Sequence, residues 1–228
     1  MSTPPHPNQP PIVFGTLSLC HALEKLGFGP CYHPLHVQKD KLKWVEWAKV
    51  LQGQTDPEFI YSILEGFGSA LDTPVTFVAD SIYKAYPNAK YILTIRDPDQ
   101  WEVSVRKTFL NPFPELLPVF ERAQRGTLTE EDHEFLDSRV PNKQGVWMLA
   151  ARARHTLKPG GSLQGDIRDE LLTHNAWIKE LIPPENLLIF DVKEGWGPLV
   201  RFLEVESELE EPFPKVNESA AYKELAQF

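Results

Sequence analysis

The stretch PPIVFGTLSLCHALEKLGFGPCYH, Pro10 to His33, decides the fold class of this chain. The apolar run Ile12 to Phe14 predicts a short buried strand. Residues 16–26 predict a helix, because their apolar side chains recur at helical spacing until Gly27 ends the pattern. The segment FGPCYH, residues 28–33, predicts a second short strand. A strand, a helix and a strand in this order favour parallel pairing.

The same stretch also looks like the start of a phosphate-binding unit. In such units a glycine-rich loop with a Lys or Arg separates strand from helix, so that backbone N–H groups and one cation surround the anion. Here Gly15 and Thr16 alone stand between the apolar run and the helical pattern, and neither carries a charge. The sequence therefore predicts the remnant of a phosphate loop at this turn.

Beyond residue 33 the chain alternates between strand and helix patterns. Two continuous apolar runs predict further buried strands, at Lys90 to Asp97 and Asn186 to Val192. Other segments predict helices, and these are residues 39–52, from Asp56-Pro57, from Pro74 to about Tyr86, from Asp97-Pro98, 165–181 and 198–203. The alternation predicts an α/β protein with a small parallel sheet flanked by helices.

The length of 228 residues suits a single domain with a sizeable core. Residues 1–11 are rich in proline and are predicted to form a disordered tail, so the domain spans residues 12–228. In residues 112–170 the pattern weakens, and we expect helices joined by loops that form a lid or cap. The proline-rich tail beyond Glu211 is expected to pack back across the surface.

Charge and composition limit the kinds of partner that this protein is expected to bind. A net charge of −9 argues against nucleic acid and anionic membranes, which need a basic face. No run approaches the roughly 20 apolar residues of a membrane span, and no signal peptide is recognisable, so we expect a cytoplasmic protein. Cys20 and Cys31 form neither a zinc motif nor a disulfide framework. We interpret them as reduced core residues rather than a reactive or bridged pair, and we predict no metal site.

Four stretches together resemble the sulfotransferase-like P-loop proteins common in fungi. They are TLSLCHALEKLGFGPCYH (16–33), YPNAKYILTIRDPDQWEVSV (86–105), PPENLLIFDVKEGWGPLVRFL (183–203) and EPFPKVNES (211–219). The resemblance runs in order over nearly the whole chain, so it implies the three-layer fold of that family.

The resemblance implies two sites for 3′-phosphoadenosine 5′-phosphosulfate, the donor that sulfotransferases use. One is an Arg at a strand end, which holds the 3′-phosphate together with a Ser in the following helix; Arg96 and Ser104 match it. The alternative is that Arg96 pairs with a neighbouring aspartate and Ser104 merely faces solvent. The other site is the loop after the first strand, of which only Gly15 and Thr16 are left.

In relatives the sequence of that loop resembles GxGRTGT. By comparison, this chain lacks several residues at the loop, an arginine among them. Two alternatives to a genuine loss of the donor site stay open. A wrongly predicted splice junction would remove the codons from an ordinary gene. Otherwise, the basic residues Arg152, Arg154 and Lys158 supply the charge, rather than forming a solvated helix face.

The resemblance also points to an acceptor site bordered by Cys31 to His33 and Asp72 to Pro74, with His33 and Asp72 as candidate catalytic residues. His33 can act as acid or base near neutral pH, and Asp72 can orient it or take a proton itself. The alternative is a structural histidine and an aspartate that caps the helix from Pro74. The expected walls of the substrate pocket are His36, Trp44, Trp47, Phe67, His174 and Asn175.

Sulfuryl transfer depends on positioned cations and N–H donors, so a missing loop argues against that chemistry. We therefore expect an enzyme of sulfotransferase-like fold that needs no cofactor. It acts on an apolar small molecule in secondary-metabolite biosynthesis, by cyclisation, isomerisation or dehydration. The alternatives are a sulfotransferase that transfers sulfate from the nucleotide donor to a small-molecule hydroxyl, and a non-catalytic binding protein.

Overall fold

The computed structural model describes residues 9–15, 17–33, 46–47, 49–50, 53–107, 118–119, 122, 127, 129–132, 134, 167–206, 209 and 211–216. The chain divides into two compact units. Unit 1 is Met1–Lys39, Gln54–Arg96 and Asn175–Val216; unit 2 is Asp40–Gly53, Asp97–His174 and Asn217–Phe228. Most of the predicted tail (1–11) and lid (112–170) lies outside the described residues, and the single domain over 12–228 stays a prediction.

The described residues of unit 1 form a five-stranded sheet whose strands are all parallel. The strands are β1 (Ile12–Phe14), β2 (Cys31–Tyr32), β3 (Ser69–Leu71), β4 (Tyr91–Thr94) and β5 (Leu187–Phe190). Their order in the sheet is β2-β3-β1-β4-β5. The prediction of an α/β fold with a small parallel sheet is confirmed.

The sequence patterns miss strand β3, because a run of Ser, Ala and Leu has no strong strand signal. Contacts with the segment before β2 hold its start in place. Gly68 donates its N–H to the carbonyl of Pro30 at 2.8 Å, and Ser69 Oγ donates to the carbonyl of Phe28 at 2.9 Å. A β-carbon at Gly68 would lie 2.6 Å from the carbonyl oxygen of Gly29, so this close approach of two backbones requires glycine.

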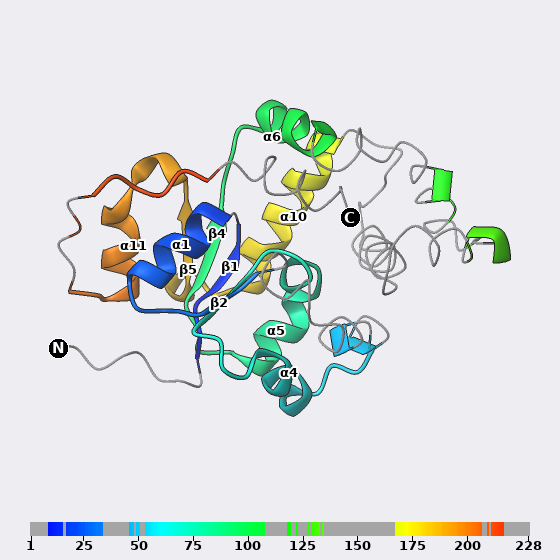
Figure 1. Ribbon diagram of the computed structural model, residues 1–228, viewed down its shortest axis with the longest axis horizontal. Coiled ribbons are helices and arrows are strands. Elements are labelled where there is room, and N and C mark those ends of the chain that lie inside the picture. Colours follow the sequence, from blue (N-terminus) through cyan, green and yellow to red (C-terminus); the bar gives the residue numbers. More distant parts are fainter. Residues whose placement is uncertain are drawn as a thin grey trace. The chain divides into compact units, whose positions relative to one another are not determined.

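Helices cover both faces of the sheet, and Figure 1 shows α1 and α11 on one side and α4 and α5 on the other. The helices of unit 1 are α1 (Leu17–Lys25), α4 (Pro57–Leu64), η1 (Val75–Val78), α5 (Ala79–Ala85), η4 (Pro184–Asn186), η5 (Val192–Glu194) and α11 (Trp196–Leu203). The connections from β1 to β2 and from β3 to β4 run in opposite directions along the sheet. Right-handed crossovers therefore place their helices on opposite faces.

Two helix starts follow the rules of capping. Asp56 accepts the N–H of Phe59 at 3.0 Å ahead of α4, with Pro57 at its first position. Asp97 accepts the N–H of Gln100 at 2.9 Å ahead of α6 (Pro98–Val105), which belongs to unit 2. Both predicted starts are confirmed, because a short carboxylate satisfies an N–H that the first turn leaves without a partner.

The core of unit 1 contains the two cysteines, both buried and free of disulfides, as predicted. A hydrogen bond with Cys31, followed by burial, raises the pKa of the Cys20 thiol. A thiol that stays protonated is a poor nucleophile, so these cysteines are packing residues.

Residues Glu211–Val216, here called the C-terminal strap, cross α1 from its last turn to its first. Lys25 donates to the Glu211 carboxylate at 2.6 Å, and the Val216 N–H donates to Ser18 Oγ at 3.0 Å. Phe213 packs between Phe190 and Trp196, with ring centroids 5.9 and 4.9 Å away. The expectation that the tail packs back is confirmed for the strap.

Unit 2 contains α6 and α10 (Ile167–Leu181) as far as His174. Arg168 on α10 donates to Asp99 Oδ1 at 2.8 Å and lies 3.6 Å from Glu102 Oε2, so these two helices are linked by charge. Trp47, at a described helical position of the same unit, is fully buried. Of the described helices, none combines the length and the apolar character that crossing a membrane requires.

Candidate active site

The carboxyl ends of parallel strands meet at one edge of a sheet, where α/β proteins bind ligands. Within unit 1, this edge brings together the residues that follow β1, β2, β3 and β4, namely Gly15, His33, Asp72 and Arg96. Strands β1 and β3 are neighbours, yet their helices leave to opposite faces. Open α/β sheets commonly bind ligands at such a switch point, and Asp72 directly follows β3 there.

His33 and Asp72, the two predicted catalytic residues, are in contact. His33 Nε2 lies 3.4 Å from Asp72 Oδ2. The two residues leave neighbouring strands: Tyr32 pairs with Ala70, so the register places His33 level with Leu71, and Asp72 is the residue after Leu71. The His33 side chain is fully buried, whereas the Asp72 side chain is 23% exposed. Asp72 is therefore the member of the pair that a ligand can reach.

Asp72 has a left-handed backbone conformation, with φ at 62°, which is uncommon for a residue other than glycine. Its N–H donates to the carbonyl of Val13 at 3.3 Å, and its own carbonyl accepts the N–H of Thr76 at 2.9 Å. Its Oδ1 accepts the N–H of Thr73. The alternative role as a helix cap is not observed, because η1 starts from Pro74 without a side-chain cap.

The turn after β1 is closely packed. A β-carbon at Gly15 would lie 2.5 Å from the methyl group of Thr94, at the end of β4. Thr94 Oγ1 in turn donates to the carbonyl of Phe14 at 2.8 Å. β1 ends at Phe14 and α1 begins at Leu17. The role of Gly15 and Thr16 as remnants of a donor site stays a prediction, and Thr16 lies outside the described residues.

Arg96, the predicted ligand of the 3′-phosphate, is exposed beyond the end of β4 in unit 1. Within unit 2, Asp97 caps α6 and Asp99 binds Arg168. The role of Arg96 stays a prediction. Ser104 is half-buried on α6, in unit 2.

The predicted pocket walls are only partly described. Phe67 precedes β3, at the opposite end of the strand from Asp72, and packs edge-to-face on Tyr32 with centroids 5.1 Å apart. Asn175 belongs to unit 1, whereas Trp47 and His174 are buried residues of unit 2. His36 and Trp44 lie outside the described residues. Among the described candidates, the structure thus brings together His33 and Asp72.

Two residues of this edge were not predicted. Thr94 closes the turn at Gly15, and Thr76 binds the carbonyl of Asp72. Neither threonine belongs to a recognisable motif, and their contacts depend on which strands are neighbours. The sequence offers one signal for Thr76, which lies two residues after the segment Asp72 to Pro74 that the family resemblance places at the acceptor site.

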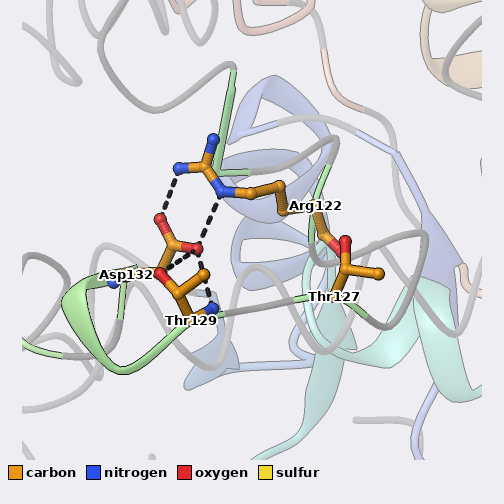
Figure 2. Close-up of polar contacts among 4 residues, drawn as sticks. All are labelled: Arg122, Thr127, Thr129 and Asp132. Carbon is orange, nitrogen blue, oxygen red and sulfur yellow. Dashed lines mark hydrogen bonds and ion pairs between the residues drawn. The ribbon is translucent and has the colours of Figure 1, made fainter.

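A second partnered carboxylate, Asp132 in unit 2, has a structural role. Figure 2 shows its oxygens bound by Arg122 and by Thr129. The Thr129 N–H donates to Asp132 at 2.9 Å, and the Asp132 N–H donates back to Thr129 Oγ1 at 3.2 Å. This reciprocal pattern is a capping box at a helix start.

Comparisons with known proteins agree with this fold. The profile of a family described as sulfotransferase domain matches residues 14–222. The Ava biosynthesis cluster protein M of Aspergillus versicolor is 25% identical over 197 residues, which cover 83% of this chain and 72% of that protein. The family match extends from the end of β1 past the C-terminal strap. The chain therefore belongs to the sulfotransferase domain family.

Proposed function

We propose that this protein is an enzyme of small-molecule biosynthesis that uses His33 and Asp72 for acid–base catalysis and does not use phosphosulfate. The observation that carries the proposal is the 3.4 Å contact between His33 Nε2 and Asp72 Oδ2 at the ligand-binding edge of the sheet. A carboxylate beside a buried imidazole can act as a general base and then as a general acid.

The difference in burial suggests a division of roles. Asp72, which is partly exposed, meets the substrate, and His33, which is fully buried, supports it from behind. In an isomerisation, Asp72 removes a proton from one substrate atom and returns it to another, so that the enzyme ends unchanged. In a dehydration the same proton leaves with the hydroxyl group as water. A cyclisation uses the same removal and return of a proton as the isomerisation, with ring closure taking place during the proton transfer.

The turn at Gly15 supports the absence of phosphosulfate chemistry. Transfer of a sulfuryl group spreads negative charge that N–H donors and cations must stabilise, and losing one such donor typically costs about 10²–10³ in rate. At this turn the Thr94 methyl group lies where a side chain of residue 15 would lie. A larger loss is expected where a whole cradle is missing.

The substrate class rests on the relative and on general chemistry. The matched Aspergillus versicolor protein is named for a biosynthesis cluster, which favours a small-molecule substrate. Holding a flexible apolar molecule in a reactive shape supplies rate without a cofactor. We therefore propose an apolar secondary metabolite as substrate, with cyclisation, isomerisation or dehydration as the reaction.

The second candidate function is sulfate transfer to a small-molecule hydroxyl. Two observations favour it besides family membership. Arg96 is exposed at the carboxyl edge of the sheet, and among the described residues of unit 1 its guanidinium forms no ion pair. Lys215 is exposed in the C-terminal strap, next to Val216, which binds Ser18 in the first turn of α1. In this case Arg96 and Ser104 bind the 3′-phosphate, and Asp72 or His33 deprotonates the acceptor.

The test starts from a strain that makes the metabolite and in which the gene for this protein is deleted. The intermediate that accumulates is purified and incubated with the purified protein, with and without 3′-phosphoadenosine 5′-phosphosulfate. We expect conversion without the nucleotide, at least about 100-fold slower in His33→Ala and Asp72→Asn. Asp132→Asn, the same change in a carboxylate that serves a capping box, should keep the wild-type rate.

Three outcomes contradict the proposal. Conversion that requires the nucleotide and transfers a labelled sulfate identifies a sulfotransferase. Micromolar binding of 3′-phosphoadenosine 5′-phosphate that Arg96→Ala abolishes points the same way. No conversion above background under either condition, with the intermediate bound, identifies a non-catalytic binding protein.

A further inference from the structure

We propose that Thr76 is a positioning residue. Its hydroxyl binds the backbone carbonyl of Asp72 and thereby keeps the Asp72 carboxylate in the orientation that faces His33. This inference rests on the proposed function and extends it to a residue with no role assigned so far. Thr76 lies in η1 and is half-buried. It donates to the carbonyl of Asp72 twice, from its N–H at 2.9 Å and from Oγ1 at 3.1 Å.

The atoms of Asp72 are each held by a different neighbour. Its N–H is held by the Val13 carbonyl on β1, and its carbonyl is held by Thr76. Its Oδ1 accepts the N–H of Thr73, which leaves Oδ2 as the carboxylate oxygen next to His33. Because Oδ1 is bound to the backbone N–H of Thr73, a change in the backbone of Asp72 also moves Oδ2 relative to His33.

The backbone conformation is one that needs such support. With φ at 62°, the β-carbon of Asp72 lies close to backbone oxygens, and a residue with a side chain leaves this region unless neighbours hold it there. The Thr76 N–H bond alone resembles an ordinary helical turn. The hydroxyl adds a second bond to the same carbonyl, and that bond is specific to the side chain.

The test measures the geometry of the pair without relying on activity. The imidazole nitrogen shifts of His33 are recorded by nitrogen-15 NMR in protein labelled at histidine. Asp72→Asn, which removes the negative charge beside Nε2, defines the shift of a broken pair. We expect Thr76→Val and Thr76→Ala to move the His33 shifts in the same direction, and Thr76→Ser, which keeps the hydroxyl, to leave them near wild type.

Activity adds a second readout once the substrate is in hand. Thr76→Val and Thr76→Ala should lower kcat about 10-fold or more with little change in KM, because the substrate still binds while the carboxylate is misplaced. Thr76→Ser should restore the rate. The matched control is Thr129→Val in unit 2. It also removes a threonine hydroxyl that is hydrogen-bonded to an aspartate, Asp132, and it should leave the His33 shifts unchanged.

The outcomes separate this inference from the proposed function. If Asp72→Asn moves the His33 shifts while Thr76→Val and Thr76→Ala do not, Thr76 does not position the pair, and the pair itself stands. If Asp72→Asn also leaves the shifts unchanged, His33 and Asp72 are not in contact, and the proposed function loses its main support. Failure of Thr76→Ser to restore the shifts also overturns the inference.

Discussion

The turn that follows β3, around Asp72, and the helix start at Thr129 to Asp132 each hold a carboxylate with a polar partner, yet the two differ in what the partner does. At Asp132 every contact serves local structure, since Thr129 and Asp132 cap a helix and Arg122 neutralises the charge. At Asp72 the backbone is left-handed, no helix is capped, and the partner is a buried histidine at the carboxyl edge of the sheet.

The comparison gives a geometric criterion for choosing which carboxylate to test as a catalytic residue. A strained backbone that several neighbours stabilise is a common feature of active sites, whereas a capping box is a feature of helices in general. Burial alone would have singled out Asp132, because its side chain is 5% exposed whereas the Asp72 side chain is 23% exposed. Local geometry separates the two.

The largest expected difference between the two regions is in catalysis. Asp72→Asn should lower the rate of substrate conversion by about 10²–10⁴, the usual contribution of a general acid or base. Asp132→Asn should change it less than about twofold, because Asp132 lies in a capping box. Initial rates at saturating substrate, with folding checked by circular dichroism, measure both. Equal losses in the two variants would remove the distinction.

The next effect concerns the backbone. At Asp72, glycine should be more stable than alanine by about 1 kcal/mol, because only glycine adopts φ of 62° without a steric cost. At Glu131, in the helical turn of the capping box, alanine should be more stable than glycine by about 1 kcal/mol. Urea unfolding of the four variants gives the two differences, and the same order at both positions would contradict the description of Asp72.

A change of similar size or smaller is expected at the capping box. Thr129→Ala removes the oxygen that accepts the Asp132 N–H and should lower the free energy of unfolding by about 1 kcal/mol. Thr129→Ser keeps the oxygen and serves as the control. Both variants should convert substrate at the wild-type rate. A loss of activity in Thr129→Ala without unfolding would show that this region takes part in catalysis.

The smallest effect is a dependence of stability on pH. The hydrogen bond from Arg122, and then the N–H of Thr129, hold the pKa of Asp132 well below its usual range. The stabilisation from this group is therefore complete above the pKa of an unfolded aspartate, about 4, and is lost as pH falls through the lowered folded value.

Thermal unfolding of wild type and Asp132→Asn from about pH 7 to about pH 2 measures this contribution. The wild type should be more stable at neutral pH, and its advantage should shrink at acidic pH. An advantage that grows as pH falls would mean that Asp132 is not ionised in the folded protein.

Much of the fold could be predicted from local patterns. Strands β1, β4 and β5 are continuous apolar runs, and the helices after Asp56 and Asp97 carry a cap followed by proline. Strand β3 could not be predicted, because Ser69-Ala70-Leu71 acquires its strand structure from neighbours on both sides and from the close approach at Gly68. Its identity as a strand is a property of the assembled sheet.

The sequence predicts which residues belong to the candidate site better than it predicts how those residues are arranged. His33 and Asp72 followed from the family resemblance, and they are in contact beyond the ends of the neighbouring strands β2 and β3. The conformation of Asp72 and the packing of Thr94 against Gly15 depend on strand order, which no local pattern encodes. The proposed aromatic walls of the pocket stay a prediction.

The C-terminal strap has a consequence for how the chain reaches its native state. Ser18 receives its hydrogen bond from Val216, and Lys25 its ion pair from Glu211, so α1 acquires these contacts from residues far along the chain. During synthesis on the ribosome α1 emerges long before those residues exist. Contacts of such large sequence separation slow folding, so the docking of the strap on α1 should be a late step of folding.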